Sequence, residues 1–303
     1  MNFSNKIKEI CLSAGFIKCG FTDAFDLHSE REYLSLWLNQ KKYADMGWML
    51  RSYERRTNPF EVMPDLKSII SLAYIYDTPF THKDEKNIPK ISRYAWGNVD
   101  YHILLKEKLK KICSEIESLD KDIRTKFFVD DGSVLEKVWA KRAGIGWMGK
   151  NTIIINENFG SFIFLCEIFI NRKLESDLPA EDLCNGCSLC VKSCPTGALE
   201  EYKLNPELCI SYHTIENKSD IPDYIDTAGW LFGCDTCQDI CPYNRRKFFT
   251  ENKCFEPQEK YFNKDISLYD SVTESVFNEY FKSTPLKRLK FERWKRNIKK
   301  LKK

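Results

Sequence analysis

Four closely spaced cysteines have the pattern of an iron–sulfur motif. Cys184, Cys187, Cys190 and Cys194, the last followed by proline, form the run C-x2-C-x2-C-x3-C-P. Three thiolates separated by two residues each can wrap around one corner of a [4Fe–4S] cube, and in two-cluster ferredoxins the fourth binds the other cluster. The run therefore predicts two clusters that further thiolates must complete.

A second group of cysteines supplies the thiolates that two clusters still need: Cys209, Cys234, Cys237 and Cys241. The economical assignment gives one cluster Cys184, Cys187, Cys190 and Cys241, and the other Cys194, Cys209, Cys234 and Cys237. Two four-cysteine zinc sites are the alternative, although the first run would crowd one tetrahedral ion. The other five are expected to be buried thiols: Cys11, Cys19, Cys113, Cys166 and Cys254.

A pair of clusters conducts electrons but holds no substrate, so the site that is reduced is expected upstream of them. Reduction also needs a proton donor. Asp130 and Asp131 are candidates because they follow an apolar strand-like stretch, and working carboxylates are common at such strand ends. The alternative is that Asp131 or Ser133 caps the next helix. The stretch 143–151 contains G-x-G-x-x-G in helix-to-strand order, which does not support a Rossmann nucleotide site.

Apolar patterns predict both helices and strands before the cysteines. Helices are expected at 1–20, 30–50, 101–119 and 133–144, strands at 68–76 and 125–131, and a hairpin at 151–170 that turns near 158–160. The order lacks a regular β-α-β rhythm, which favours an α+β fold. We expect a mixed α/β domain at 1–173, a ferredoxin-like two-cluster domain at 174–248 and a short basic helical segment at 249–303.

Charge is distributed unevenly along the chain. Residues 281–303 carry eleven Lys and Arg against the single acid Glu292, so this segment has a net charge of +10. Because the whole chain has a net charge of +3, the remainder has −7. A basic end suggests a polyanionic partner such as RNA, DNA or a membrane surface. A solvated amphipathic helix packed on the core explains the pattern equally well.

Neither a membrane span nor an export signal is expected. No run of eighteen apolar residues occurs, and charges interrupt the first residues before they reach the apolar length of a signal peptide. We therefore expect a cytoplasmic protein without a membrane partner. In that compartment, cysteines stay reduced and a dense cysteine pattern favours metal over disulfides.

Several motifs together resemble the epoxyqueuosine reductase family. They are ISRYAWGNVDYH (91–102), RTKFFVDDGSVLEKVWAKRAGIGWMGKN (124–151), the first cysteine run and GWLFGCDTCQDICPYN (229–244). The resemblance implies reduction of the epoxide of epoxyqueuosine to queuosine at the wobble position of tRNA, the last step of queuosine biosynthesis. It also implies a cobalamin, two [4Fe–4S] clusters, an electron donor such as a flavodoxin or ferredoxin system, and a monomer. The family is related to the reductive dehalogenases.

The resemblance also assigns roles to single residues. Asp130 matches the proton donor in the family's V-D-T-G stretch, although Asp131 stands where threonine is frequent. Arg56 matches an arginine that contacts the cobalamin, and Ser92 stands where some members have a cysteine near the cofactor. The other positions implied to lie at the cobalamin are Ile154, Leu165, Ser211 and Asp235. The implied chemistry is reduction of the cobalamin by the clusters, opening of the epoxide, and protonation of its oxygen by Asp130.

Long family members carry a helical-repeat domain after the clusters, whereas this chain ends with its basic segment. We expect that segment, together with Arg245, Arg246 and Lys247, to provide part of the RNA grip. Three other functions are weighed: a cobalamin-dependent reductase of another small substrate, such as an organohalide, a ferredoxin-like electron carrier, and a nucleic-acid-binding protein with structural clusters. The large structured part before the clusters argues against a simple carrier.

Overall fold

An antiparallel sheet forms the centre of the first half of the chain. The structure, a computed structural model, describes residues 2–245 and 248–303. The strand order is β1 (Lys18–Asp23), β2 (Ser68–Ile75), β7 (Ile163–Ile170) and β4 (Thr125–Phe128). All neighbouring pairs are antiparallel. Every residue of β2 is buried, which identifies it as a central strand covered on both faces.

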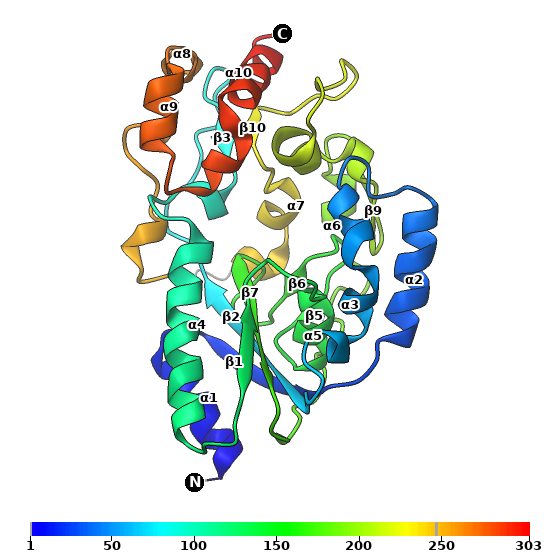
Figure 1. Cartoon of the computed structure of the whole chain (residues 1–303). Helices are drawn as coiled ribbons and strands as arrows, with labels where there is room; N and C mark the ends of the chain where they lie inside the picture. Colours follow the sequence, from blue (N-terminus) through cyan, green and yellow to red (C-terminus); the bar gives the residue numbers. More distant parts are fainter. Residues whose placement is uncertain (1, 246–247) are drawn as a thin grey trace.

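Helices cover both faces of this sheet (Figure 1). On one face, α1 (Phe3–Ser13) and α4 (Tyr101–Ser118) pack against the side chains of Ile70, Leu72 and Tyr74. On the other face, α5 (Glu136–Arg142) packs against Ala73 and Ile75, while α2 (His28–Asn39) and α3 (Tyr53–Thr57) lie farther out. This arrangement follows from the alternation of side chains along a strand, which gives β2 two apolar faces.

Short elements build the cysteine-rich part of the chain. They are β5 (Trp147–Met148), β6 (Ile154–Ile155), α6 (Leu189–Lys192), β8 (Leu199–Glu200), β9 (Lys203–Leu204) and α7 (Thr236–Asp239). A π-helical turn, η5 (Tyr212–Glu216), lies within the insertion that separates the cysteines of the second group. Loops dominate here because the chain has little apolar core of its own between the thiols.

The C-terminal segment contributes a second core. The helices α8 (Ile266–Asp270), α9 (Glu274–Tyr280) and α10 (Lys290–Leu301), with the 3-10 turn η8 (Pro285–Leu289), pack over β10 (Trp230–Phe232), which pairs in parallel with β3 (Lys90–Ile91). Trp294 and Phe232 lie fully buried in this core. Within the described residues, no helix is long and apolar enough to cross a membrane.

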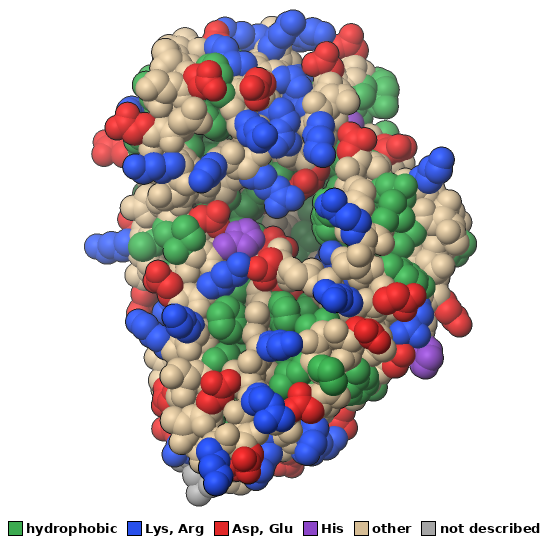
Figure 2. Space-filling model, viewed as in Figure 1, with side chains coloured by type: hydrophobic (Ala, Val, Ile, Leu, Met, Phe, Trp, Pro, Cys, Tyr) green, Lys and Arg blue, Asp and Glu red, His purple; other side chains and the backbone are tan. Residues whose placement is uncertain are grey.

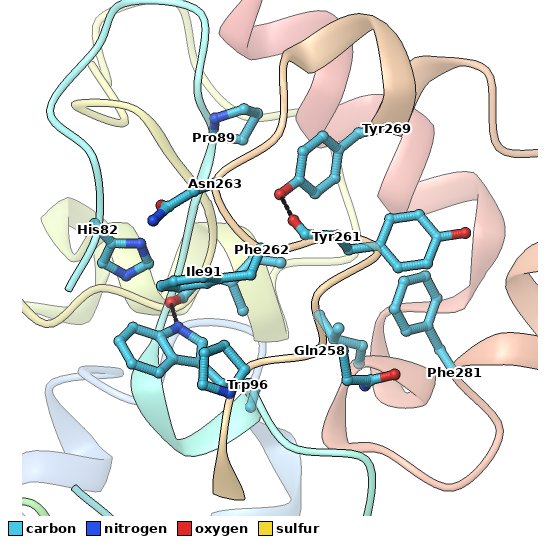
Figure 3. A pocket seen from close by; sticks show the side chains of 13 residues that line it. His82, Pro89, Ile91, Trp96, Gln258, Tyr261, Phe262, Asn263, Tyr269 and Phe281 are labelled. Carbon is cyan, nitrogen blue, oxygen red and sulfur yellow. Dashed lines mark hydrogen bonds between the residues drawn. The ribbon is translucent and has the colours of Figure 1, made fainter. Parts of the chain in front are cut away.

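A small cavity lies inside this second core (Figure 3). Its volume is about 20 Å³, and its walls include His82, Trp96 and Phe262. Burial lowers the pKa of His82 to about 4, so this imidazole is neutral at physiological pH. The volume suits a group the size of one water molecule and excludes a cofactor.

The structure confirms most of the predicted elements and corrects two. The strand at 68–76, the helix at 101–119 and the helix before Gly144 are present. The helix expected over 1–20 ends at Ser13, because the chain turns and enters β1. The turn expected near 158–160 is present, since Asn156 and Gly160 exchange backbone hydrogen bonds. The strand pairing of the expected hairpin was wrong, because β6 pairs with β5 whereas β7 pairs with β2 and β4.

Candidate active site

Asp130 lies on the loop between β4 and α5 in a conformation that is uncommon for a residue with a side chain. Its φ is 49°, in the left-handed region. Its backbone N–H donates to Glu136 Oε1 at 2.6 Å, and its Oδ2 accepts from the hydroxyl of Tyr101 at 2.5 Å. The side chain is 61% exposed, so this oriented carboxyl remains accessible to a substrate.

Asp131 has a different role in the same loop. Its Oδ1 accepts from the N–H of Val129 at 3.0 Å, and its Oδ2 forms an ion pair with Lys106. The helix α5 begins after Leu135, and no described side chain caps that end. The expectation that Asp131 or Ser133 caps the helix is therefore wrong, and Asp131 fixes the turn instead.

The carboxyl of Asp130 faces two adjoining cavities. One, of about 590 Å³, is lined among others by Tyr94, Tyr101, His102, Phe164, Glu216 and Arg288. The other, of about 530 Å³, extends past Arg56 and shares Asp130, Glu216 and Arg288 with the first. Figure 2 shows a hollow in this face of the molecule with Lys and Arg side chains gathered above it. An acid at the boundary of two open cavities can donate a proton to a ligand in either one.

Arg56 lines the second cavity and carries a buried hydrogen-bond donor. Its Nε is buried and finds no hydrogen-bond acceptor among the described residues, while its guanidinium carbon lies 5.2 Å from the centre of the Trp48 ring. Burial lowers the pKa of this guanidinium below its ordinary value. A buried donor without an acceptor costs about 1–3 kcal/mol, which points to a ligand that supplies the acceptor.

The eight thiols of the cysteine-rich segment gather in two groups. Burial raises the pKa of Cys190, and the neighbouring thiols Cys184, Cys241 and Cys187 raise it further. Burial likewise raises the pKa of Cys237, and the neighbouring thiols Cys234 and Cys209 raise it further. Burial also raises the pKa of Cys209, and its neighbour Cys194 adds to this rise. The two sets of four are those expected from the spacing, and Cys190 and Cys237 also interact across them.

Hydrogen-bond donors reach a thiol in each of the two groups. Trp147 Nε1 donates to Cys184 Sγ at 3.4 Å, and the N–H of Ala198 donates to Cys194 Sγ at 3.3 Å. Two groups of four thiols supply the number of ligands that two [4Fe–4S] clusters need.

Of the five other cysteines, Cys11, Cys19, Cys113 and Cys166 are buried free thiols, as expected. Cys254 is only partly buried. No disulfide is recorded among these residues, and none is needed to explain the packing of their apolar neighbours.

The remaining predicted cofactor residues fall in three places. Ser92 Oγ donates to Asp235 Oδ1 at 2.5 Å, and both side chains are buried. Ile154 and Leu165 pack in the core between α5 and the sheet, and neither lines the two cavities. Ser211 is half-buried and directly precedes η5, whose Glu216 lines both cavities. Of the predicted cofactor residues, Asp130 and Arg56 are therefore the two that line these cavities.

The basic C-terminal helix is largely occupied by contacts within the protein. Arg296 donates to the carbonyls of His213, Asn217 and Ser219, and Arg293 donates to the carbonyl of Ile215 at 2.5 Å. These carbonyls belong to η5 and the residues after it, so α10 holds this wall of the cavity. The packed-helix interpretation thus accounts for much of its charge.

Other cations near the cavity remain exposed. Lys287 and Lys290 line the larger cavity, and neither forms an ion pair within the described residues. Arg245 is exposed at the end of its turn, whereas Arg246 and Lys247 lie outside the described residues. Lys287 and Lys290, which we call the rim of the larger cavity, therefore offer positive charge that no described acid pairs with.

Sequence reasoning missed several groups at this site. Tyr101, Glu136 and Arg288 contact or flank Asp130 but were not singled out. Glu167 was also missed, although an acid within the apolar strand FLCEIFI is an anomaly that the sequence displays. A buried acid in a central strand requires a partner.

Comparisons with known proteins match both parts of the site. Residues 56–131 match the family model described as epoxyqueuosine reductase QueG, DUF1730, and residues 183–244 match that of a 4Fe-4S double cluster binding domain. Epoxyqueuosine reductases of Leadbetterella byssophila and Atelocyanobacterium thalassa are 37% and 38% identical to this chain. The first match covers 98% of this chain and 97% of the relative, and the second covers 99% of each.

Solved structures agree with these matches. A crystal structure of epoxyqueuosine reductase with an epoxyqueuosine-modified tRNA-Tyr stem loop superposes with a TM-score of 0.89 at 31% identity, covering 98% of this chain and 80% of that one. A Bacillus subtilis structure, described with its catalytic aspartate loop swung out of the active site, superposes with a TM-score of 0.88 at 31% identity and the same coverage.

Proposed function

The chain belongs to the epoxyqueuosine reductase family, and from this premise we propose that it reduces the epoxide of epoxyqueuosine in tRNA to give queuosine. The modified base is the one at the wobble position, and the step is the last in queuosine formation. The observation that carries the proposal is an oriented acid, Asp130, at the boundary of two open cavities, in one molecule with two groups of four thiols.

We propose that residues 174–248 bind two [4Fe–4S] clusters in the two thiol groups and that residues 1–173 hold most of a cobalamin. Support for the clusters comes from the double-cluster match and from the grouping of the thiols. Support for the cobalamin comes from the buried Arg56 Nε, because that cofactor carries amide and phosphate acceptors. When bound, the clusters and the cobalamin supply the electrons for the reduction.

The residues of the chain then have distinct tasks. Arg56 donates to an acceptor group of the cobalamin, and Ser92, Ile154, Leu165, Ser211 and Asp235 surround it more distantly. Asp130 donates a proton to the epoxide oxygen as the carbon–oxygen bond breaks, which lowers the cost of the charge developing on that oxygen. Overall, the epoxide takes up two electrons and two protons and becomes an alkene and water.

The partner is tRNA, and we propose that the exposed cations of the rim bind its phosphates. Lys287 and Lys290 stand at the larger cavity, where an unpaired anticodon base enters. Sequence-selective RNA-binding proteins favour unpaired loops, and lysines on phosphates make the affinity dependent on salt. The electron donor that we propose is a flavodoxin or ferredoxin system, and the protein acts as a monomer.

The decisive experiment is an anaerobic turnover assay. The chain, reconstituted with iron, sulfide and cobalamin, is incubated with reductant and epoxyqueuosine-containing tRNA, and the nucleosides are identified by mass. Asp130→Asn is expected to keep the iron and corrinoid absorbance and to lose turnover at least a hundredfold, the scale of general acid catalysis. Asp131→Asn is the matched control, because an amide oxygen can still accept from Val129. Wild-type material that leaves the epoxide intact overturns the proposed function.

A further inference from the structure

We propose that the carboxyls of Glu136 and Glu167 share one proton and, as a carboxyl pair, hold the Asp130 loop so that its acid faces the cavities. Both are then positioning residues for the proton donor. The inference deepens the proposed function and rests on it only for the consequence on turnover. The structural part, which concerns the loop, stands on the contacts described below.

Glu167 lies in the middle of β7 and is fully buried. Its Oε1 accepts from the hydroxyl of Ser71 at 3.2 Å, whereas its Oε2 has no hydrogen-bond donor in the described part of the chain when both acids are ionised. The side chain close enough to hydrogen-bond with it is the carboxyl of Glu136. Two carboxyls can hydrogen-bond to one another only if one of them carries a proton.

The environment of Glu136 and Glu167 favours the state in which one of the two carboxyls is protonated. Burial raises the pKa of both Glu136 and Glu167, and the negative charge of each raises that of the other. Asp130 and Asp131 add further negative charge from the loop. The cations that interact with Glu136 are Arg56 and Lys137, and on β7 the neighbouring thiol is Cys166. Glu167 is fully buried, whereas Glu136 is half-buried and lines the second cavity. Two carboxyls in contact, one of them shielded from water, favour a state in which only one is ionised.

The carboxyl pair acts on Asp130 through its backbone. Glu136 Oε1 accepts the N–H of Asp130 at 2.6 Å, while the other end of the pair is fixed to the sheet through Ser71. Asp130 has a left-handed φ of 49°, which is uncommon for residues with a side chain, although aspartate tolerates it better than most. The hydrogen bond to Glu136 accompanies this conformation, in which the carboxyl accepts from Tyr101 and lines the cavities.

A relative indicates that a loop of this kind can take a second position. In the Bacillus subtilis relative, the catalytic aspartate loop is described as swung out of the active site. The carboxyl pair is therefore expected to set the balance between two loop positions in this chain. The sheet supplies the fixed end because β7 is a central strand that does not move with the loop.

The test measures hydrogen exchange of the Asp130 amide, since this N–H is the one that the carboxyl pair accepts. In the full chain, Glu136→Ala is expected to speed that exchange about tenfold and to lower kcat about tenfold with KM for tRNA unchanged. Glu136→Gln keeps an acceptor for the amide and is expected to restore both to within about twofold of wild type. Lys141→Ala, an exposed position on the same helix, is the control.

A second variant covers the case in which Glu136→Ala fails to fold. Glu167→Gln carries a donor to Glu136 at every pH, so its Asp130 amide is expected to stay protected at alkaline pH, where wild type loses protection as the shared proton leaves. Equal pH dependence in both proteins overturns the inference, as does unchanged exchange in Glu136→Ala or failure of Glu136→Gln to restore it. Exchange needs no substrate, so the carboxyl pair can fail while the reductase activity stands, and the reverse.

Discussion

Replacing Arg296 by alanine tests whether α10 stabilises the cavity wall or binds the RNA. Its guanidinium donates to the carbonyl of Asn217 at 2.7 Å, to that of His213 at 2.8 Å and to that of Ser219. These carbonyls follow Cys209 and form the wall that contains Glu216. If these contacts are the purpose of the residue, its loss loosens the wall and lowers the stability of the fold.

The magnitude follows from the number and setting of the bonds. A hydrogen bond from a charged group contributes about 1.5–3 kcal/mol. Burial lowers the pKa of Arg296 to about 10, which records the cost of placing this cation in the protein and offsets part of the gain. Three bonds from one half-buried group are not additive, so the loss is about 2–4 kcal/mol. With an unfolding entropy of about 2.1 cal/mol/K per residue, a chain of 303 residues loses roughly 3–6 °C in Tm.

The assay combines thermal unfolding with hydrogen exchange of residues 211–219. Arg296→Ala is expected to lower the Tm and to speed exchange in this segment. Lys299→Ala, an exposed residue of the same helix with no ion pair or hydrogen bond recorded in the described residues, is expected to change the Tm by less than about 1 °C. The reasoning is refuted if Arg296→Ala leaves the Tm and the exchange unchanged and only weakens tRNA binding, because the helix would then serve the RNA.

Three further predictions concern the clusters, the rim and the response to pH. Cys190→Ala is expected to reduce the bound iron and the absorbance near 400 nm of the reconstituted protein, and an unchanged iron content would remove Cys190 from the ligand set. Lys287→Ala is expected to weaken binding of a tRNA stem loop and to reduce the slope of log K against log salt by about one, whereas Lys282→Ala, exposed but outside the cavity rim, serves as its control. Burial raises the pKa of Asp77 to about 6, against the opposing effect of Arg93, so the folded state keeps a proton that the unfolded state releases between about pH 4 and 6. The stability that this carboxyl contributes is therefore present at low pH and is lost as the pH rises through 6. Asp77→Asn is expected to flatten that dependence, by up to about 1.4 kcal/mol per pH unit relative to wild type, in denaturant titrations at several pH values.

The sequence contained the parts of the site that depend on local spacing. The cysteine run predicted two groups of four thiols, and the strand-end position of Asp130 predicted an accessible acid; the structure has both arrangements. The elements at 68–76 and 101–119 were also recognised, because continuous apolar runs and helical periodicity are local signals.

Contacts between distant parts of the chain left weaker signals. The strand β7 pairs with β2 and β4, which no local pattern near residues 151–170 reveals. The local turn was therefore predicted correctly, whereas the strand pairing was wrong. Arg296 donates to backbone carbonyls about eighty residues earlier in the chain. Because every residue has a backbone carbonyl, no residue type in the sequence marks these acceptors. Glu167 is the exception, since an acid within an apolar strand shows that a buried partner must exist, although it does not show which one.

Two sets of positioning contacts, from different parts of the chain, lie on either side of the boundary between the cavities. The first set positions the proton donor: Glu136 accepts the N–H of Asp130 and holds its loop against the sheet. The second set positions η5 next to a cysteine of the proposed clusters, because the N–H of His213 donates to the Cys209 carbonyl at 3.1 Å. The helix α10 also holds η5, through Arg293 and Arg296.

A reduction that delivers electrons and a proton to one bond needs both the Asp130 loop and η5 in place. The contacts that position the loop and those that position η5 are separate. Substitutions more than about 7–10 Å apart with no shared partners have additive effects. Arg296→Ala should therefore leave exchange of the Asp130 amide unchanged, and Glu136→Ala should leave exchange of 213–219 unchanged. The link between them is the ion pair of Arg288 with Glu216 at 2.6 Å, because these two residues line both cavities beside Asp130. If either variant altered the other segment, that ion pair is where the coupling would have to pass.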